Sequence, residues 1–147
     1  MASNTGKVWA AYQATQKSGT GDWTALAIAD NASAYSAIID CSGYSDIIFG
    51  IGLTEDDTGA INGLVTVSIL GDVDGTNFEE GPGLASAQVG NPYGFTVIPV
   101  QNDVVYVRFK LSVSDFDRIK INLLNEGGQI LTTTVKHKFA DVPAAVA

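Results

Sequence analysis

Basic residues are missing from most of this 147-residue chain. Residues 18–107 contain neither lysine nor arginine, although they hold twelve of the sixteen acidic residues. The whole chain has eight Lys and Arg residues and a formal net charge of −8 at pH 7. Affinity for nucleic acid comes largely from the neutralisation of phosphates by Lys and Arg, so this balance argues against such a partner.

Cysteine and histidine each occur once, as Cys41 and His137. A single cysteine excludes an internal disulfide and a multi-thiolate zinc site. A catalytic histidine needs a nucleophile and an orienting carboxylate, and no nucleophile motif accompanies His137. We predict an inert buried thiol, a strand histidine, and no catalytic residue, metal or cofactor. A hydrolase stays open as an alternative, and it would need His137 close to a Ser, a Thr or Cys41, together with a carboxylate.

Long apolar runs are also absent. Residues 47–53 form one of the most apolar stretches, far below the roughly 20 residues that a membrane helix needs. Residues 1–7 are not followed by an apolar segment of signal-peptide length. We therefore expect no membrane partner, and a protein that is made in the cytoplasm without a cleaved export signal. Hydrophobic residues still make up 46% of the chain, which is enough for one domain with a core.

Apolar and polar residues alternate with a period of two along much of the chain, which predicts strands. The clearest case is residues 104–113, where Val105, Val107, Phe109 and Leu111 alternate with polar neighbours. Further strands are predicted at residues 7–14 (an edge strand or a short helix), 23–28, 34–39, 47–53, 63–70, 95–100, 119–123 and 129–139. This pattern predicts an all-β fold, a β-sandwich or jelly roll, with extended N- and C-terminal arms.

Turn residues between the predicted strands indicate how the strands connect. Residues 114–117 and 125–128 predict turns, so residues 104–113, 119–123 and 129–139 would form an antiparallel meander. Residues 47–53 are apolar in both phases, which is typical of a central strand covered on both faces. Residues 81–92 are expected to form a surface loop.

The domain organisation predicted from these patterns has three parts. They are an N-terminal arm at residues 1–20, a β-sandwich domain at 21–139 and a C-terminal tail at 140–147.

Two further patterns have both a functional and an ordinary interpretation. Asp72, Asp74 and Asn77 resemble part of a calcium loop, but the terminal bidentate glutamate is missing, so a hairpin turn is favoured. Several aromatic residues are candidates for a sugar-stacking platform, although aromatic side chains are more often buried. They are Trp9, Tyr12, Trp23, Tyr44 and Tyr93.

Basic residues gather on the polar side of two successive predicted strands. Paired strands would place Arg108, Lys110, Arg118 and Lys120 in one basic patch that meets an acidic surface, either on a neighbouring copy or on another protein. The alternative is neutralisation by acids of the adjacent turns, namely Asp115, Asp117 and Glu126. The candidate partner-binding residues are Lys7, Trp9, Tyr12, Lys17, Arg108, Lys110, Arg118, Lys120, Lys136 and Lys138.

Two segments resemble small β-sandwich virion proteins of tailed bacteriophages, including capsid decoration (cement) proteins. Residues 65–78 form a strand followed by an Asp-Gly-x-Asn-aromatic turn, and residues 105–111 contain the Tyr-Val-Arg sequence that often accompanies it. The resemblance implies a non-enzymatic homotrimer on the capsid surface of the virion, made in the host cytoplasm. Such a protein binds the major capsid protein and stabilises the shell. The alternative is a phage tail or receptor-binding module that recognises cell-surface carbohydrate.

Overall fold

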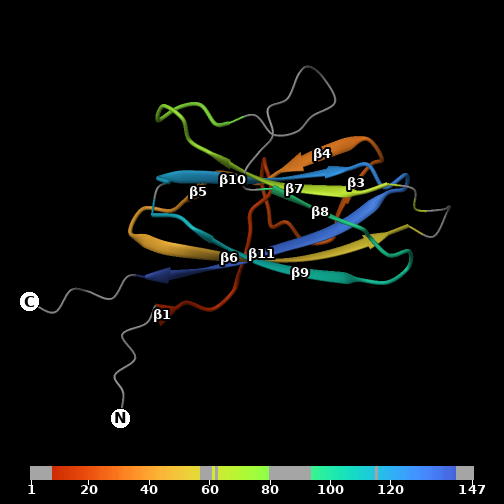
Figure 1. The fold of residues 1–147 in the computed structure, drawn as a ribbon, viewed down its shortest axis with the longest axis horizontal. Helices are drawn as coiled ribbons and strands as arrows, with labels where there is room; N and C mark the ends of the chain where they lie inside the picture. Colours follow the sequence, from red (N-terminus) through yellow and green to blue (C-terminus); the bar gives the residue numbers. More distant parts are fainter. Residues whose placement is uncertain (1–7, 57–60, 62, 80–93, 115, 142–147) are drawn as a thin grey trace, which may run out of the picture.

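The computed structural model describes residues 8–56, 61, 63–79, 94–114 and 116–141. These residues form two antiparallel sheets that pack face to face, so the predicted all-β sandwich is confirmed (Figure 1). Within these ranges the elements are strands and turns, and no helix is long and apolar enough to cross a membrane.

Eleven strands are assigned within the described residues. The six-stranded sheet contains β1 (Val8–Trp9), β2 (Gln13–Ala14), β3 (Leu26–Ile28), β6 (Tyr44–Glu55), β9 (Val105–Ser112) and β11 (Leu131–Asp141). In it β6 lies between β9 and β11, and β1, β2 and β3 pair with β11. The five-stranded sheet contains β4 (Ala32–Tyr35), β5 (Ile39–Asp40), β7 (Val65–Gly71), β8 (Gly94–Val97) and β10 (Arg118–Asn125). Its order is β4–β10–β7–β8, with β5 also paired to β10.

The core lies between the two sheets and is built from alternate residues of the long strands. Phe49 and Ile51 of β6, Val67 of β7 and Ile121 of β10 belong to one buried cluster. Each such aliphatic or aromatic side chain contributes about 1.5–3 kcal/mol when it leaves water, so this cluster holds the sheets together. The period-two pattern therefore predicted the buried face of β7 and β10 correctly.

The predicted meander is wrong, because β9, β10 and β11 do not pair with one another. β9 pairs with β6, β10 pairs with β7 in the other sheet, and β11 returns to the other side of β6. Between β9 and β10, Val113 is buried and Phe116 packs against the core, so this connection crosses from one sheet to the other. Alternation shows which side chains face the core, but it does not show which strand is the neighbour.

Strands β1 and β2 of the predicted N-terminal arm and the described start of the predicted tail belong to the six-stranded sheet. β1 and β2 both pair with β11, and Ala140 of the predicted tail is buried within β11. Val8 pairs with Asp141, so the two ends of the described chain lie side by side (Figure 1). The sandwich therefore includes residues on both sides of the predicted boundaries. Residues 1–7 and 142–147, and the predicted loop at 81–92, lie outside the described residues.

β6 is the central strand of its sheet, as predicted, but only one of its faces is buried in the core. Ile47, Phe49, Ile51 and Leu53 face inward, whereas the alternate positions of the strand lie on the outer face of the sheet. The interpretation of residues 47–53 as covered on both faces is corrected here. The outward positions of this strand include glycines, which carry no polar side chain. The sequence pattern therefore did not distinguish the outer face of the strand from its buried face.

Candidate functional site

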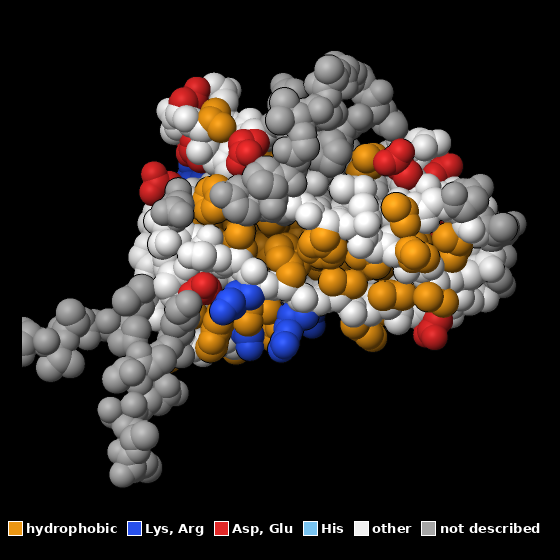
Figure 2. Space-filling model, viewed as in Figure 1, with side chains coloured by type: hydrophobic (Ala, Val, Ile, Leu, Met, Phe, Trp, Pro, Cys, Tyr) orange, Lys and Arg blue, Asp and Glu red, His pale blue; other side chains and the backbone are white. Residues whose placement is uncertain are grey.

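The outer face of the six-stranded sheet collects four basic side chains from two strands far apart in sequence. Across β6, Ile48 lies between Lys110 of β9 and Lys138 of β11, and Gly50 lies between Arg108 and Lys136 in the same way. Residues directly opposite one another on paired strands share a face, so the four cations form one cluster. Figure 2 shows Lys and Arg side chains gathered on the side where Figure 1 places this sheet. We call Arg108, Lys110, Lys136 and Lys138 the cationic face.

None of these four side chains forms an ion pair with another described residue. The ion pair found in the described part of the chain joins Arg118 to Asp72, on the other sheet. Arg108, Lys110 and Lys136 are exposed. Lys138 is half-buried, and its Nζ lies 4.7 Å from the centre of the Tyr12 ring and 5.5 Å from that of Trp9. These cation–π contacts bring two predicted aromatic candidates to the cationic face.

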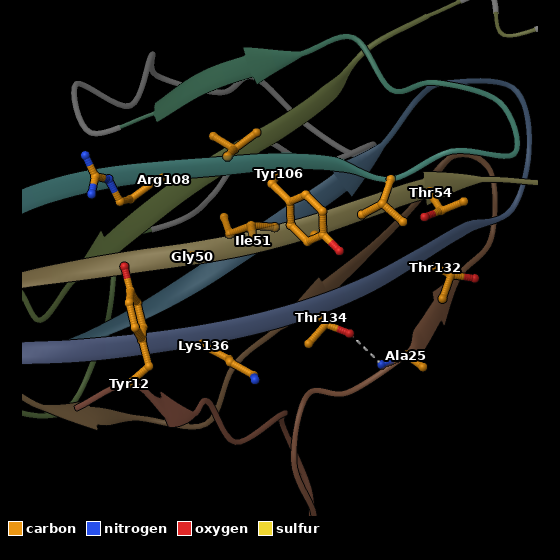
Figure 3. Close-up of a pocket in the computed structure, with 13 residues that line it drawn as sticks. Tyr12, Ala25, Gly50, Ile51, Thr54, Tyr106, Arg108, Thr132, Thr134 and Lys136 are labelled. Carbon is orange, nitrogen blue, oxygen red and sulfur yellow. Dashed lines mark hydrogen bonds between the residues drawn. The ribbon is translucent and has the colours of Figure 1, made fainter.

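A groove of about 620 Å³ runs along β6 on the same outer face (Figure 3). Gly50, Gly52 and Thr54 lie along its floor, Val104, Tyr106 and Arg108 on the β9 side, Thr132, Thr134 and Lys136 on the β11 side, and Tyr12 near Gly50. Its volume is within the usual range of ligand sites. The groove and the cationic face therefore share Arg108 and Lys136.

The glycines of β6 make room for the two tyrosine rings that flank this groove. A Cβ at Gly50 would lie 3.6 Å from Cε1 of Tyr12, and a Cβ at Gly52 would lie 3.4 Å from Cε1 of Tyr106. Tyr106 is 82% exposed, the largest exposed fraction among the large hydrophobic side chains described. Sequence reasoning did not select Tyr106 as a site residue. The sequence feature that could have identified Tyr106 is an aromatic residue at a position of an amphipathic strand where a polar residue is expected.

Arg118 and Lys120 do not join the cationic face, so the predicted four-residue patch is wrong. Both lie on β10 in the other sheet. Arg118 donates to Asp72, with Nη2 2.8 Å from Oδ2, and this hydrogen bond contributes most to lowering the pKa of Asp72. Lys120 Nζ lies 4.5 Å from the centre of the Phe78 ring. Arg118 is thus neutralised within the chain by Asp72, which was not among the predicted acids of the adjacent turns, and of those acids Asp115 lies outside the described residues.

Among the remaining basic candidates, Lys17 is not part of this cluster. The backbone of Lys17 forms an isolated β-bridge with Ser36, the residue after β4 of the five-stranded sheet. Lys7 lies outside the described residues. Of the ten predicted partner-binding residues, the structure therefore brings six together on one face, namely Trp9, Tyr12, Arg108, Lys110, Lys136 and Lys138.

The predicted aromatic platform is not formed as a set. Trp23 is fully buried, and its Nε1 donates to Thr133 Oγ1 at 2.6 Å, so its assignment to an exposed platform is wrong. Tyr44 stacks on Phe139 with ring centres 4.0 Å apart. Tyr93 lies outside the described residues. Trp9 and Tyr12 are the predicted aromatics that lie beside the cationic face.

Cys41 is buried, as predicted, and His137 lies in strand β11, as predicted, where it is also buried. Burial lowers the pKa of His137 to about 4 and raises the pKa of Cys41 to about 12. His137 Nδ1 lies 2.6 Å from Oγ1 of Thr15, which is the contact that a hydrolase would require. Thr15 is fully buried, however, and no described carboxylate is hydrogen-bonded to His137. This pair therefore provides no support for a hydrolase.

The Asp72–Asn77 segment forms a tight turn, which is the interpretation that the sequence favoured. Asp72 Oδ1 accepts the amide of Asp74 at 3.0 Å, and Asp74 Oδ1 accepts the amides of Thr76 and Asn77. Gly75 has a φ of +86°, which suits glycine. Within the described ranges, no group of three or more His, Cys, Asp or Glu side chains is arranged to hold a metal ion.

No family model matches this chain, and no curated protein matches it. Function is therefore inferred from the cationic face, its groove and the sequence resemblance.

Proposed function

We propose that this chain is a non-enzymatic virion structural protein of the capsid decoration type. It binds an acidic area of the major capsid protein through the cationic face and thereby stabilises the shell. One observation supports this proposal above the others. Arg108, Lys110, Lys136 and Lys138 stand together without a described carboxylate partner, in a chain whose net charge is −8.

Electrostatics explains why such a cluster favours an acidic partner. Like charges on neighbouring strands are mildly destabilising, because the cations repel one another across β6. An acidic surface that covers them reverses the sign of this interaction and guides the approach of the partner. Since the long segment without Lys or Arg supplies most of the acids, the basic face also orients the molecule toward the partner.

Stabilisation of a shell follows from selective binding to the assembled state. A protein that binds across subunit junctions of the assembled shell, and not to free subunits, shifts the equilibrium toward assembly. The proposed location is the outer capsid surface, after synthesis in the host cytoplasm. The proposed oligomer is a homotrimer, in which each copy contributes one cationic face.

Reversal of two charges on the cationic face tests this proposal. The variant Arg108→Glu/Lys136→Glu is expected to bind shells at least about 100-fold more weakly, because carboxylates then face an acidic surface. Its control is Lys17→Glu/Lys120→Glu, which has the same net charge but leaves the cationic face intact. Both variants are sedimented with empty shells assembled from the major capsid protein of the same genome, at low and high salt. Equal binding of the two variants at low salt would show that the cationic face is not the docking surface.

A second candidate function is recognition of cell-surface carbohydrate, as expected of a tail or receptor-binding module. The specific observation in its favour is that Tyr12 and Tyr106 flank the groove, because aromatic rings can stack on sugar rings. Binding of the isolated protein to a glycan array, without any affinity for shells, would favour this second function over the first.

A further inference from the structure

The groove along β6 has the length of a short extended peptide. Gly50, Gly52 and Thr54 occupy successive outward positions of one strand, and adjacent strands carry the walls. A strand rises about 3.3 Å per residue, so the floor from Gly50 to Thr54 is about 13 Å long. This corresponds to four or five residues of an extended chain.

The two ends of the groove differ in charge. Arg108 and Lys136 flank Gly50 within the groove. Lys110 and Lys138 lie one row beyond it and buried Asp46 lies in the next row, so this end carries a net positive charge. Toward Thr54 the walls carry hydroxyl and apolar side chains without charge, namely Val104, Tyr106, Thr132 and Thr134. A complementary ligand is therefore acidic at one end and apolar at the other.

The polar groups of the groove suit a polypeptide better than a sugar. The cations Arg108 and Lys136 donate hydrogen bonds and accept none, so they suit the carboxylates of an acidic polypeptide, whereas a neutral sugar offers no negative charge. No carboxylate or carboxamide side chain is among the described residues that line the groove. Thr134 Oγ1 already accepts the amide of Ala25 at 3.0 Å.

The spacing of the cations also matches an extended chain. Arg108 and Lys110 are two residues apart on β9, and Lys136 and Lys138 are two residues apart on β11. Alternate residues of an extended segment lying along β6 have the same spacing, about 6.6 Å. Two acidic residues at alternate positions of that segment would each reach one row of cations.

We infer that this groove binds an extended acidic segment of the partner protein, with two acidic residues at alternate positions and a large apolar residue two positions away. The acidic residues pair with the cationic face, and the apolar side chain packs against Tyr106 and Val104. This inference rests on the proposed function, because it specifies which part of the capsid protein makes the contact.

Synthetic peptides test this inference directly. The probes are acetyl-Glu-Ser-Glu-Ser-Leu-Ser-amide and the peptide with its residues in reverse order, because the groove does not determine chain direction. One of the two is expected to shift the amide resonances of Gly50 and Gly52 in an NMR titration. Replacing both Glu residues of that peptide by Gln is expected to weaken binding at least about 10-fold, since the charge-assisted pairs are lost. Replacing its Leu by Ser is expected to weaken binding about 5-fold. This loss corresponds to the free energy gained by burying about one CH₂ group or slightly more.

The protein variant Tyr106→Ser separates the apolar contribution from the charge contribution. Because Tyr106 is 82% exposed, this change leaves the core intact. It should remove the preference for Leu over Ser in the peptide while keeping the preference for Glu over Gln. A thermal melt of the variant checks that its fold is unchanged.

Each alternative outcome has a different meaning. If hyaluronan oligosaccharides shift Gly50 and Gly52 and neither peptide does, a saccharide is the ligand and the inference is overturned. If shells bind in a charge-dependent way but neither peptide binds, the inference fails and the proposed function stands. If one peptide binds as expected but the protein does not bind shells, the groove is an acidic-peptide site and the proposed capsid role fails.

Discussion

Replacement of Trp23 by alanine is expected to lower the free energy of unfolding by about 3–5 kcal/mol. Trp23 is fully buried within the core cluster, so its truncation leaves a large cavity between the sheets. The change also removes the hydrogen bond from Trp23 Nε1 to Thr133 Oγ1. For a domain of this size the melting temperature should fall by about 10 °C or more.

Trp9 offers a matched control, because it is the only other tryptophan in the chain. It lies half-buried at the edge of the six-stranded sheet. The change Trp9→Ala should therefore cost only about 1 kcal/mol, as is usual for a partly exposed position. Urea denaturation followed by far-ultraviolet circular dichroism measures both variants. A cost for Trp9→Ala as large as that for Trp23→Ala would contradict the assignment of Trp23 to the core.

The change Glu55→Gln is expected to stabilise the protein increasingly as pH rises from 4.5 to above 7. Glu55 is fully buried, and neither of its carboxyl oxygens has a hydrogen-bond partner among the described residues. Burial, and then the charges of Asp30 and Asp56, raise the pKa of Glu55 from 4.5 to about 7. Between these values the unfolded chain ionises at this position while the folded chain stays protonated.

The sign of the effect follows from proton linkage. The folded state binds more protons in this window, so the stability of the wild-type protein falls as pH rises through it. Above pH 7 the loss amounts to at most about 3 kcal/mol, and Gln cannot ionise. We expect the difference in unfolding free energy between Glu55→Gln and wild type to grow between pH 4.5 and pH 8.

Urea titrations at several pH values measure this difference in unfolding free energy. Any contribution of the Gln amide that is independent of pH leaves the change of the difference with pH unaltered. The comparison also cancels the contribution of His137, whose lowered pKa reduces stability as pH falls from 6.5 toward 4. The variant Asp117→Asn is a control, because it removes an acid that makes no described contact with Glu55. A difference for Glu55→Gln that stays constant with pH would show that Glu55 is ionised in the folded protein.

Only part of the candidate site could be predicted from the sequence. Arg108 and Lys110 were predicted to act together, because they occupy the polar phase of one amphipathic strand. Their predicted partners, Arg118 and Lys120, were wrong because the connection after β9 crosses to the other sheet. Lys136 became their neighbour only because β11 pairs with the opposite side of β6.

The groove could not be predicted from local patterns. Gly50 and Gly52 leave room beside β6, but the groups that occupy it come from distant segments. Tyr12 and Tyr106 meet at this strand only after β2, β6, β9 and β11 have assembled in one sheet. Similarly, the local sequence does not distinguish Glu55 from the neighbouring acids Asp56 and Asp57, and only the packed fold shows that it is buried.

The sequence by itself determined that this protein is an all-β sandwich, where its long strands lie, and which side chains of its amphipathic strands face the core. Those properties follow from period-two alternation and turn residues, which act over a few neighbouring positions. Tertiary structure alone decided which strands pair, and therefore which cations share the outer face of the six-stranded sheet. Strand pairing depends on contacts between segments far apart in the chain, and a local pattern does not specify those contacts.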